Sequence, residues 1–320
     1  MLRPHMGKRA DSPYHGGFDP FPVVRMPFRQ LLLVPLLLVL TACGPRTPSA
    51  PSLERNTVMP LFFPGWGSRD GQRVQTLHLE GAEGRFDVSP VQVVRLSDQR
   101  AVLVTAATEV DEHGEAAAGH DTPGVLGAYW LRRDGERWLA DGRQDDAGRA
   151  GFFGEVGSTD VVRLAAGRYA LSVEYSSCWQ GECGGWLALY ELGEHRVRPL
   201  LGEPIALSAL NSGSVPPPAD CDAILAREPG TTERLPEEEE RHACYEVTGS
   251  WQIVPGHDAP GDLVLDFVSL KEDYTAQPED ASAPLVWAVS STRRATQRMI
   301  YRYRGDSYLP FSGSNPVPSF

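Results

Sequence analysis

The sequence predicts an all-β protein built from repeated four-stranded antiparallel units. Apolar and polar residues alternate along most of the chain with the period of two that is typical of β-strands. Glycine (32 residues) and proline (27 residues) are more frequent than in an average globular protein, which indicates many turns. The motif VVRL at 93–96, followed by a turn and a second apolar run, recurs as VVRL at 161–164. This recurrence predicts an internal structural repeat.

The repeated units are expected at about 88–150, 158–203 and 248–313, within a β-repeat domain of residues 57–320. Four short strands per unit resemble the blades of a β-propeller, and a duplicated β-sandwich is the alternative. Residues 204–247 are predicted to form one small, partly helical insertion, because three consecutive prolines at 216–218 interrupt the strand pattern.

Residues 26–42 have the composition of a secretory signal peptide. Arg29 supplies a positive charge, and the apolar run at 31–40 is too short to span a bilayer, which needs roughly 20 residues. The sequence Leu-Thr-Ala-Cys at 40–43 follows, and it resembles the lipobox of bacterial lipoproteins. The resemblance implies cleavage before Cys43, lipidation of Cys43 and attachment to a bacterial membrane through the acyl chains. It also implies that the following domain lies in the cell envelope, on the extracytoplasmic side.

The segments on either side of the signal peptide are not expected to belong to the folded domain. Residues 1–25 are rich in proline, glycine and histidine and do not fit the start of a signal peptide. We therefore expect translation to begin at Met26 and interpret 1–25 as an upstream start-site artefact. Residues 43–56 are polar and proline-rich, and they are predicted to form a lipidated, flexible tether.

The charge of the chain argues against one class of partner. The sequence contains 42 acidic and 30 basic residues, which gives a formal net charge of −12. Nucleic-acid binding requires a basic face that neutralises phosphates, so we expect no nucleic-acid partner. Anionic lipids also repel such a domain, so the acyl chains are expected to hold it at the membrane.

Apart from Cys43, the chain contains four cysteines, namely Cys178, Cys183, Cys221 and Cys244. An even number of cysteines in an exported protein predicts disulfides, with three possible pairings. Local pairing is favoured, with Cys178–Cys183 at the end of a hairpin and Cys221–Cys244 across the insertion. A four-cysteine zinc site is the alternative, although the spacing lacks paired C-x2-C motifs.

Trp179, Gln180 and Glu182 are the ligand-binding candidates, because they lie inside the expected Cys178–Cys183 loop. A rigid, exposed aromatic ring beside amide and carboxylate groups is suited to stack on a sugar or a peptide side chain. Packing of Trp179 against the disulfide is the alternative.

A loop rich in acids and histidines lies between two predicted strands of the first unit. Its candidate metal ligands are Glu109, Asp111, His113, His120 and Asp121. Carboxylates and imidazoles in one loop can hold a divalent cation. Their spacing matches neither an EF-hand nor H-E-x-x-H, so a solvated acidic loop is the alternative.

The sequence contains none of the G-x-S-x-G, P-loop, Rossmann or S-x-x-K motifs. We therefore expect a binding or structural module of the envelope that needs no cofactor, with an envelope protein or a glycan as ligand. An envelope hydrolase with a site assembled from distant loops is one alternative, since all-β folds often build sites in this way. A metal-binding protein that uses residues 109–121 is the other.

Overall fold

The computed structural model describes residues 48–67, 73–211, 221–228, 232–236, 244–278 and 285–318. The start-site segment, the signal peptide and the lipidation site Cys43 lie outside the described residues, and predictions about them stay predictions. Within the described ranges, no helix has both the length and the apolar character that crossing a bilayer requires.

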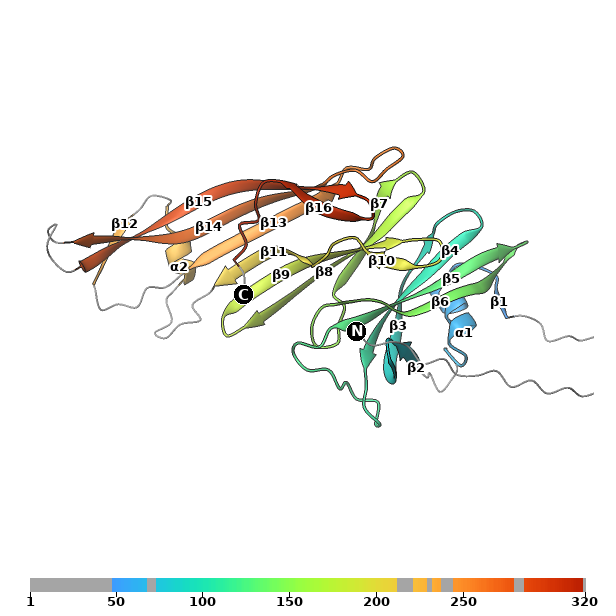
Figure 1. Cartoon of the computed structure of the whole chain (residues 1–320). Coiled ribbons are helices and arrows are strands. Elements are labelled where there is room, and N and C mark those ends of the chain that lie inside the picture. Colours follow the sequence, from blue (N-terminus) through green and yellow to red (C-terminus); the bar gives the residue numbers. More distant parts are fainter. Residues whose placement is uncertain are drawn as a thin grey trace, which may run out of the picture. The chain divides into compact units, whose positions relative to one another are not determined.

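A meander of antiparallel strands forms the first sheet, in the order β1-β6-β5-β4-β3-β2 (Figure 1). Its strands are β1 (Ser49–Ala50), β2 (Val74–Leu79), β3 (Ala82–Arg95), β4 (Arg100–Glu109), β5 (Gly124–Asp134) and β6 (Arg137–Ala150). From β2 to β6 each strand pairs with the next one along the chain. Short turns, such as the one at Gly135 with φ 59°, make this local pairing possible.

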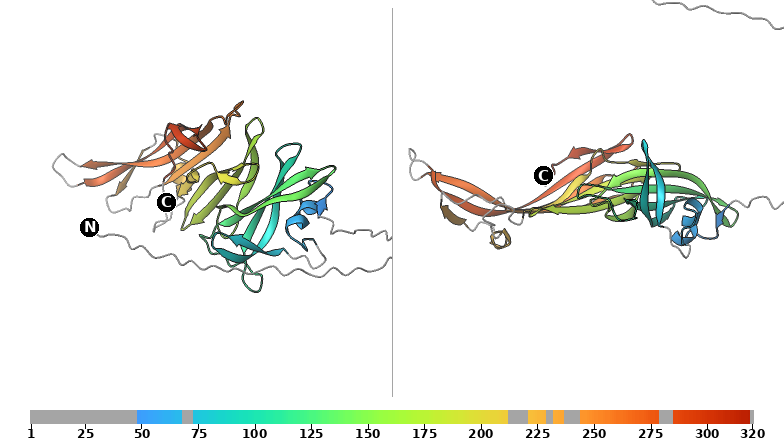
Figure 2. Two further views of the ribbon diagram at one scale, coloured as in Figure 1. Left: turned by 45° about the vertical axis from the view of Figure 1, so that its right-hand side comes forward. Right: turned by 90° about the horizontal axis from the view of Figure 1, so that it is seen from below.

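The second sheet has the order β12-β15-β14-β13-β11-β9-β8-β7, with β10 paired to β9 and β16 paired to β15. Its strands are β7 (Ser158–Ala165), β8 (Arg168–Trp179), β9 (Glu182–Leu192), β10 (Val197–Pro199), β11 (Ile205–Asn211), β12 (Thr232–Pro236), β13 (Tyr245–Ile253), β14 (Leu263–Pro278), β15 (Leu285–Arg304) and β16 (Ser307–Ser312). Figure 2 shows its continuous course from β7 to the long β14–β15 hairpin.

The all-β prediction is confirmed, because antiparallel sheets dominate the described chain and its helices are two short segments, α1 (Arg55–Phe62) and α2 (Cys221–Leu225). The repeated VVRL motifs also occupy equivalent places, at the turn of the β3–β4 hairpin and at the turn of the β7–β8 hairpin.

The second sheet is not divided into the separate four-stranded units that the sequence predicts. Strand β11 pairs with β9 on one side and with β13 on the other, and it therefore joins the expected second and third units into one sheet. This strand lies in the segment expected to be an insertion. Alternating burial along its seven residues explains why it completes the sheet rather than leaving it. The described strands form one sheet of six strands and one of ten, so the propeller-like arrangement is not confirmed.

An apolar core lies between the two sheets. Val102, Val104 and Leu126 from the first sheet cluster with Leu171 and Val173 from the second.

Close packing of a tyrosine ring of β9 against a glycine of β6 forms part of this interface. The ring of Tyr190 lies so near Gly148 that a Cβ there would be 2.4 Å from Cε1 of the ring. The Tyr190 hydroxyl donates a hydrogen bond to the carbonyl of Arg149 at 2.8 Å, and the buried indole of Trp130 donates to the carbonyl of Gly193 at 2.8 Å.

The structure differs from the expected tether at its C-terminal end. Ser49 and Ala50 pair with Leu139 and Trp138 of β6, so the chain belongs to the first sheet from residue 49 onward. Helix α1 then packs its buried side chains on the face of the first sheet that is turned away from the second. The apolar residues 58, 59, 62 and 63 have helical spacing and supply this contact.

Candidate functional site

The β8–β9 hairpin ends in the predicted disulfide between Cys178 and Cys183, whose Cα atoms are 4.0 Å apart. Beyond it, Trp179 and Glu182 form a cross-strand pair around a two-residue turn at Gln180 and Gly181. Both turn residues have positive φ (51° and 88°), as a type I′ hairpin turn requires. The three predicted binding residues therefore lie together at this tip, and Trp179 is 62% exposed.

His120 contacts this tip from the connection between β4 and β5. Its ring centroid lies 4.9 Å from that of Trp179 and 4.7 Å from that of Phe153. Its Nε2 atom lies 3.0 Å from the hydroxyl oxygen of Ser177. The imidazole is therefore in contact with both exposed rings.

Phe153 presents its ring to solvent from an unusual backbone conformation. Its φ of 54° lies in the left-handed region, which costs a bulky residue about 1–2 kcal/mol. The main chain is held there because the amide of Phe153 donates to the carbonyl of His120 (3.2 Å) and that of Gly154 donates to Thr122 (2.8 Å). The side chain is 55% exposed. This geometry links the 151–157 connection to the 120–122 segment.

A deeper layer of rings supports the exposed ones. The Phe152 centroid lies 5.8 Å from Tyr175 and 5.4 Å from Trp186, and Tyr175 stacks on Trp186 at 5.8 Å. Burial raises the pKa of the Tyr175 hydroxyl above its ordinary value. We call the whole group the aromatic surface; it consists of His120, Phe152, Phe153, Tyr175, Trp179 and Trp186.

The expected metal ligands are not brought together. The carboxylate of Asp111 accepts hydrogen bonds from the amides of His113 (2.8 Å) and Glu115 (3.0 Å), so it closes the turn of its own loop. His113 is exposed beside Glu112, and His120 belongs to the aromatic surface. Across the described ranges, no three His, Cys, Asp or Glu side chains are arranged to hold a metal ion.

The second predicted disulfide, Cys221–Cys244, is also confirmed, with Cα atoms 5.3 Å apart. Both pairings are the local ones. The zinc alternative is therefore wrong, because disulfide sulfur atoms are not the thiolates that bind zinc.

A groove of about 1260 Å³ lies between β6 and β10, and charged side chains line it. Within it Arg143 pairs with Asp145 at 2.5 Å, and Arg149 pairs with Asp146 at 2.7 Å. Because these charges are compensated inside the protein, we interpret the groove as part of the contact between the sheets.

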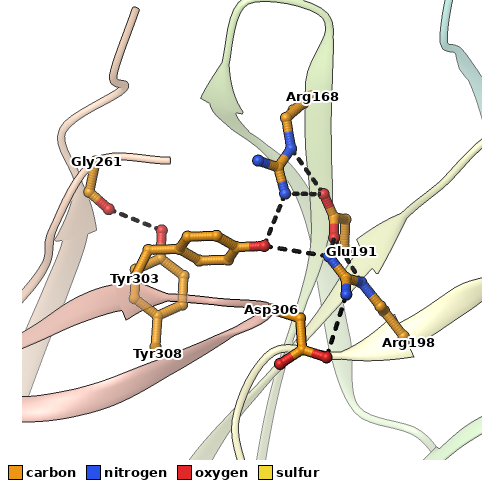
Figure 3. A network of polar contacts seen from close by, with 7 residues as sticks. All are labelled: Arg168, Glu191, Arg198, Gly261, Tyr303, Asp306 and Tyr308. Carbon is orange, nitrogen blue, oxygen red and sulfur yellow. Dashed lines mark hydrogen bonds and ion pairs between the residues drawn. The ribbon is translucent and has the colours of Figure 1, made fainter. Parts of the chain in front are cut away.

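One wall of the groove continues into the network in Figure 3. The buried carboxylate of Glu191 accepts hydrogen bonds from Arg168 and Arg198, both at 2.8 Å from Nε. The Tyr303 hydroxyl oxygen accepts from the same two guanidinium groups, at 2.8 and 3.1 Å. The hydrogen bonds with Glu191 hold the pKa of Arg198 above its ordinary value. This network ties β15 to β8, β9 and β10.

Sequence reasoning missed the partners of Trp179. Phe152 and Phe153 carry a usable local signal, because two aromatic residues between Gly151 and Gly154 are unusual in a polar turn. Tyr175 and Trp186 read as ordinary strand residues.

Comparisons with known proteins give no relative: no family model, no curated protein and no solved structure matches this chain. Interpretation of the site therefore depends on its own geometry.

Proposed function

We propose that this protein is a lipid-anchored binding module of the bacterial cell envelope and that the aromatic surface binds its ligand. The observation that carries the proposal is that two exposed rings, Trp179 and Phe153, both contact the imidazole of His120. A disulfide fixes one ring, and a left-handed backbone fixes the other. Rigid aromatic side chains lose little conformational entropy on binding, so they are effective anchors.

The proposed location is supported by two features of the chain. The lipobox-like sequence that ends at Cys43 matches the signal for acylation in bacterial lipoproteins. The two disulfides fit an oxidising compartment outside the cytoplasm, because such bonds are rare in reducing ones.

The proposed ligand is an envelope glycan or an envelope protein, since both offer groups that stack on aromatic rings. The test is a titration of the purified protein with envelope glycan fragments and with peptides, in which tryptophan fluorescence reports binding. Trp179→Ala and Phe153→Ala should each weaken binding at least tenfold, which corresponds to about 1.4 kcal/mol. Phe311→Ala is the matched control, because Phe311 is an aromatic side chain of similar exposure (48%) on β16. Equal binding by all three variants and by the native protein would exclude the aromatic surface as the binding site.

A second candidate function, envelope hydrolase, is favoured by one contact. The hydroxyl of Ser177 lies within hydrogen-bond distance of His120 Nε2, which is the arrangement of a nucleophile and its general base. Incubation with a fluorophosphonate tests it. Covalent labelling of Ser177 that disappears in His120→Ala would support a hydrolase, and an unlabelled Ser177 would exclude this mechanism.

A further inference from the structure

We propose that the ligand of the aromatic surface is a basic segment of a protein partner, which places Arg or Lys side chains against the exposed rings. This inference depends on the proposed function and narrows its ligand class. It follows from the charges that surround the rings.

Each of the three segments that form the aromatic surface carries one carboxylate. Glu182 is the cross-strand partner of Trp179 and therefore stands beside it on the same face of the hairpin. Glu155 is exposed two residues after Phe153, and Asp121 is exposed next to His120. The segments that form the surface, 120–122, 152–155 and 175–186, contain these three acids and no arginine or lysine.

Two described arginines near these segments, Arg73 and Arg149, already have carboxylate partners. Arg73 lines a pocket next to Glu155, and its Nε lies 3.0 Å from the carboxylate of Asp87. Arg149, which precedes Phe152 in the chain, pairs with Asp146 at 2.7 Å. Within the part of the chain that the structure describes, the three carboxylates form no ion pair with an arginine or lysine, and a ligand can supply the cation.

Rings and carboxylates together favour a cation. The faces of Trp and Phe rings attract Arg and Lys electrostatically, and nearby carboxylates add to the same attraction. A ligand that covers the carboxylates displaces their hydration, and a cationic group compensates this loss better than a neutral hydroxyl. An anionic ligand is repelled, both locally and by the net charge of −12.

The experiment uses the purified full-length protein and three synthetic 12-residue peptides of equal length. In these peptides, leucine alternates with arginine, with glutamine or with glutamate; a neutral glucan oligomer is the fourth probe. We expect the arginine peptide to bind best, with an affinity that falls as the salt concentration rises. The double variant Glu155→Gln and Glu182→Gln, which keeps Trp179, should bind the arginine peptide about tenfold more weakly. Asp134→Asn combined with Glu136→Gln, at the exposed β5–β6 turn, removes the same charge and should leave binding unchanged.

The outcomes separate this inference from the proposed function. Binding of the neutral glucan through Trp179, unaffected by the Glu155 and Glu182 changes, would overturn the basic-ligand inference and leave the binding module intact. Equal weakening by the control pair would also overturn it, because the attraction would then be a property of total charge. If Trp179→Ala binds both the peptides and the glucan as well as the native protein does, both proposals are overturned.

Discussion

The imidazole of His120 and the hydroxyl of Ser177 are joined at 3.0 Å, although one residue follows the first sheet's β4 and the other belongs to β8 of the second sheet. The same imidazole contacts the rings of Trp179 and Phe153, with centroids 4.9 and 4.7 Å away. The exposed part of the aromatic surface is therefore assembled from two sheets, and His120 is the residue that joins them.

Trp179 should matter for binding and little for stability. Because its ring is mostly exposed, Trp179→Ala removes few packing contacts, and we expect the free energy of unfolding to change by less than about 1 kcal/mol. Trp130→Ala, in the core between the sheets, should cost about 3–5 kcal/mol. Urea denaturation of both variants measures the difference. A large loss of stability in Trp179→Ala would mean that its ring serves packing.

Both disulfides should contribute to stability, but only Cys178–Cys183 should contribute to binding. Replacing Cys178 and Cys183 with serine opens a short loop and should cost about 2 kcal/mol, together with a loss of affinity, because Trp179 is then less rigidly held. Replacing Cys221 and Cys244 with serine should cost about 3.5 kcal/mol and leave affinity unchanged. Urea denaturation and ligand titration of both double variants test this. Unchanged affinity in the first variant would show that the bridge does not preorganise the surface.

Local features of this fold could be predicted from the sequence, because the interacting residues are close in the chain. The hairpin that carries the VVRL motif and the Cys178–Cys183 bridge are both of this kind. Strand β11 was not predicted, although its signal is also local. Its alternating pattern is visible, but the prolines that follow it led us to place the whole region in an insertion.

The aromatic surface could be predicted only in part. Trp179 has a local signal in the cysteine loop, whereas its contacts with His120 and Phe153 arise from sheet packing over long sequence separations. Acidic neighbours of His120 led to the metal hypothesis, since composition does not reveal that the ring turns toward the hairpin. Helix α1 was missed because the apolar residues around Met59 were assigned to the start of the β domain.

Glu191 should be a strong determinant of stability. Glu191→Gln removes the negative charge between two half-buried guanidinium groups and leaves them facing each other, so we expect a loss of about 2 kcal/mol. Asp266→Asn is the control, because Asp266 pairs with Arg298 at a partly exposed site (side chains 43% and 64% exposed) and its removal should have little effect. Urea denaturation measures both, and equal effects would contradict the special role of the buried carboxylate.

Alkaline pH should destabilise the protein through its buried tyrosines. Burial raises the pKa of Tyr190 to about 12 in the folded state, against an unfolded value of about 10. A raised folded pKa contributes stability that is fully present below pH 10 and is lost as the pH rises to 12. The contribution of Tyr190 is about 2.7 kcal/mol at most. Tyr190→Phe should flatten the decline of stability over this range, and an unchanged slope in denaturation curves from pH 9 to 12 would contradict the assignment.

The lipid anchor should depend on Cys43 alone. Acylation of the cysteine that follows Leu-Thr-Ala would attach the chain to the membrane, since two or more acyl chains hold a protein stably and the acidic domain does not bind anionic lipid. Cys43→Ser should therefore move the protein from the membrane fraction to the soluble fraction of bacterial cells. Cys221→Ser, which removes a different cysteine, should leave the distribution unchanged. Intact mass measurement should find acyl chains on the native protein and none on Cys43→Ser. A Cys43→Ser protein that stays in the membrane fraction would contradict the lipoprotein interpretation and leave the aromatic surface to be tested in another compartment.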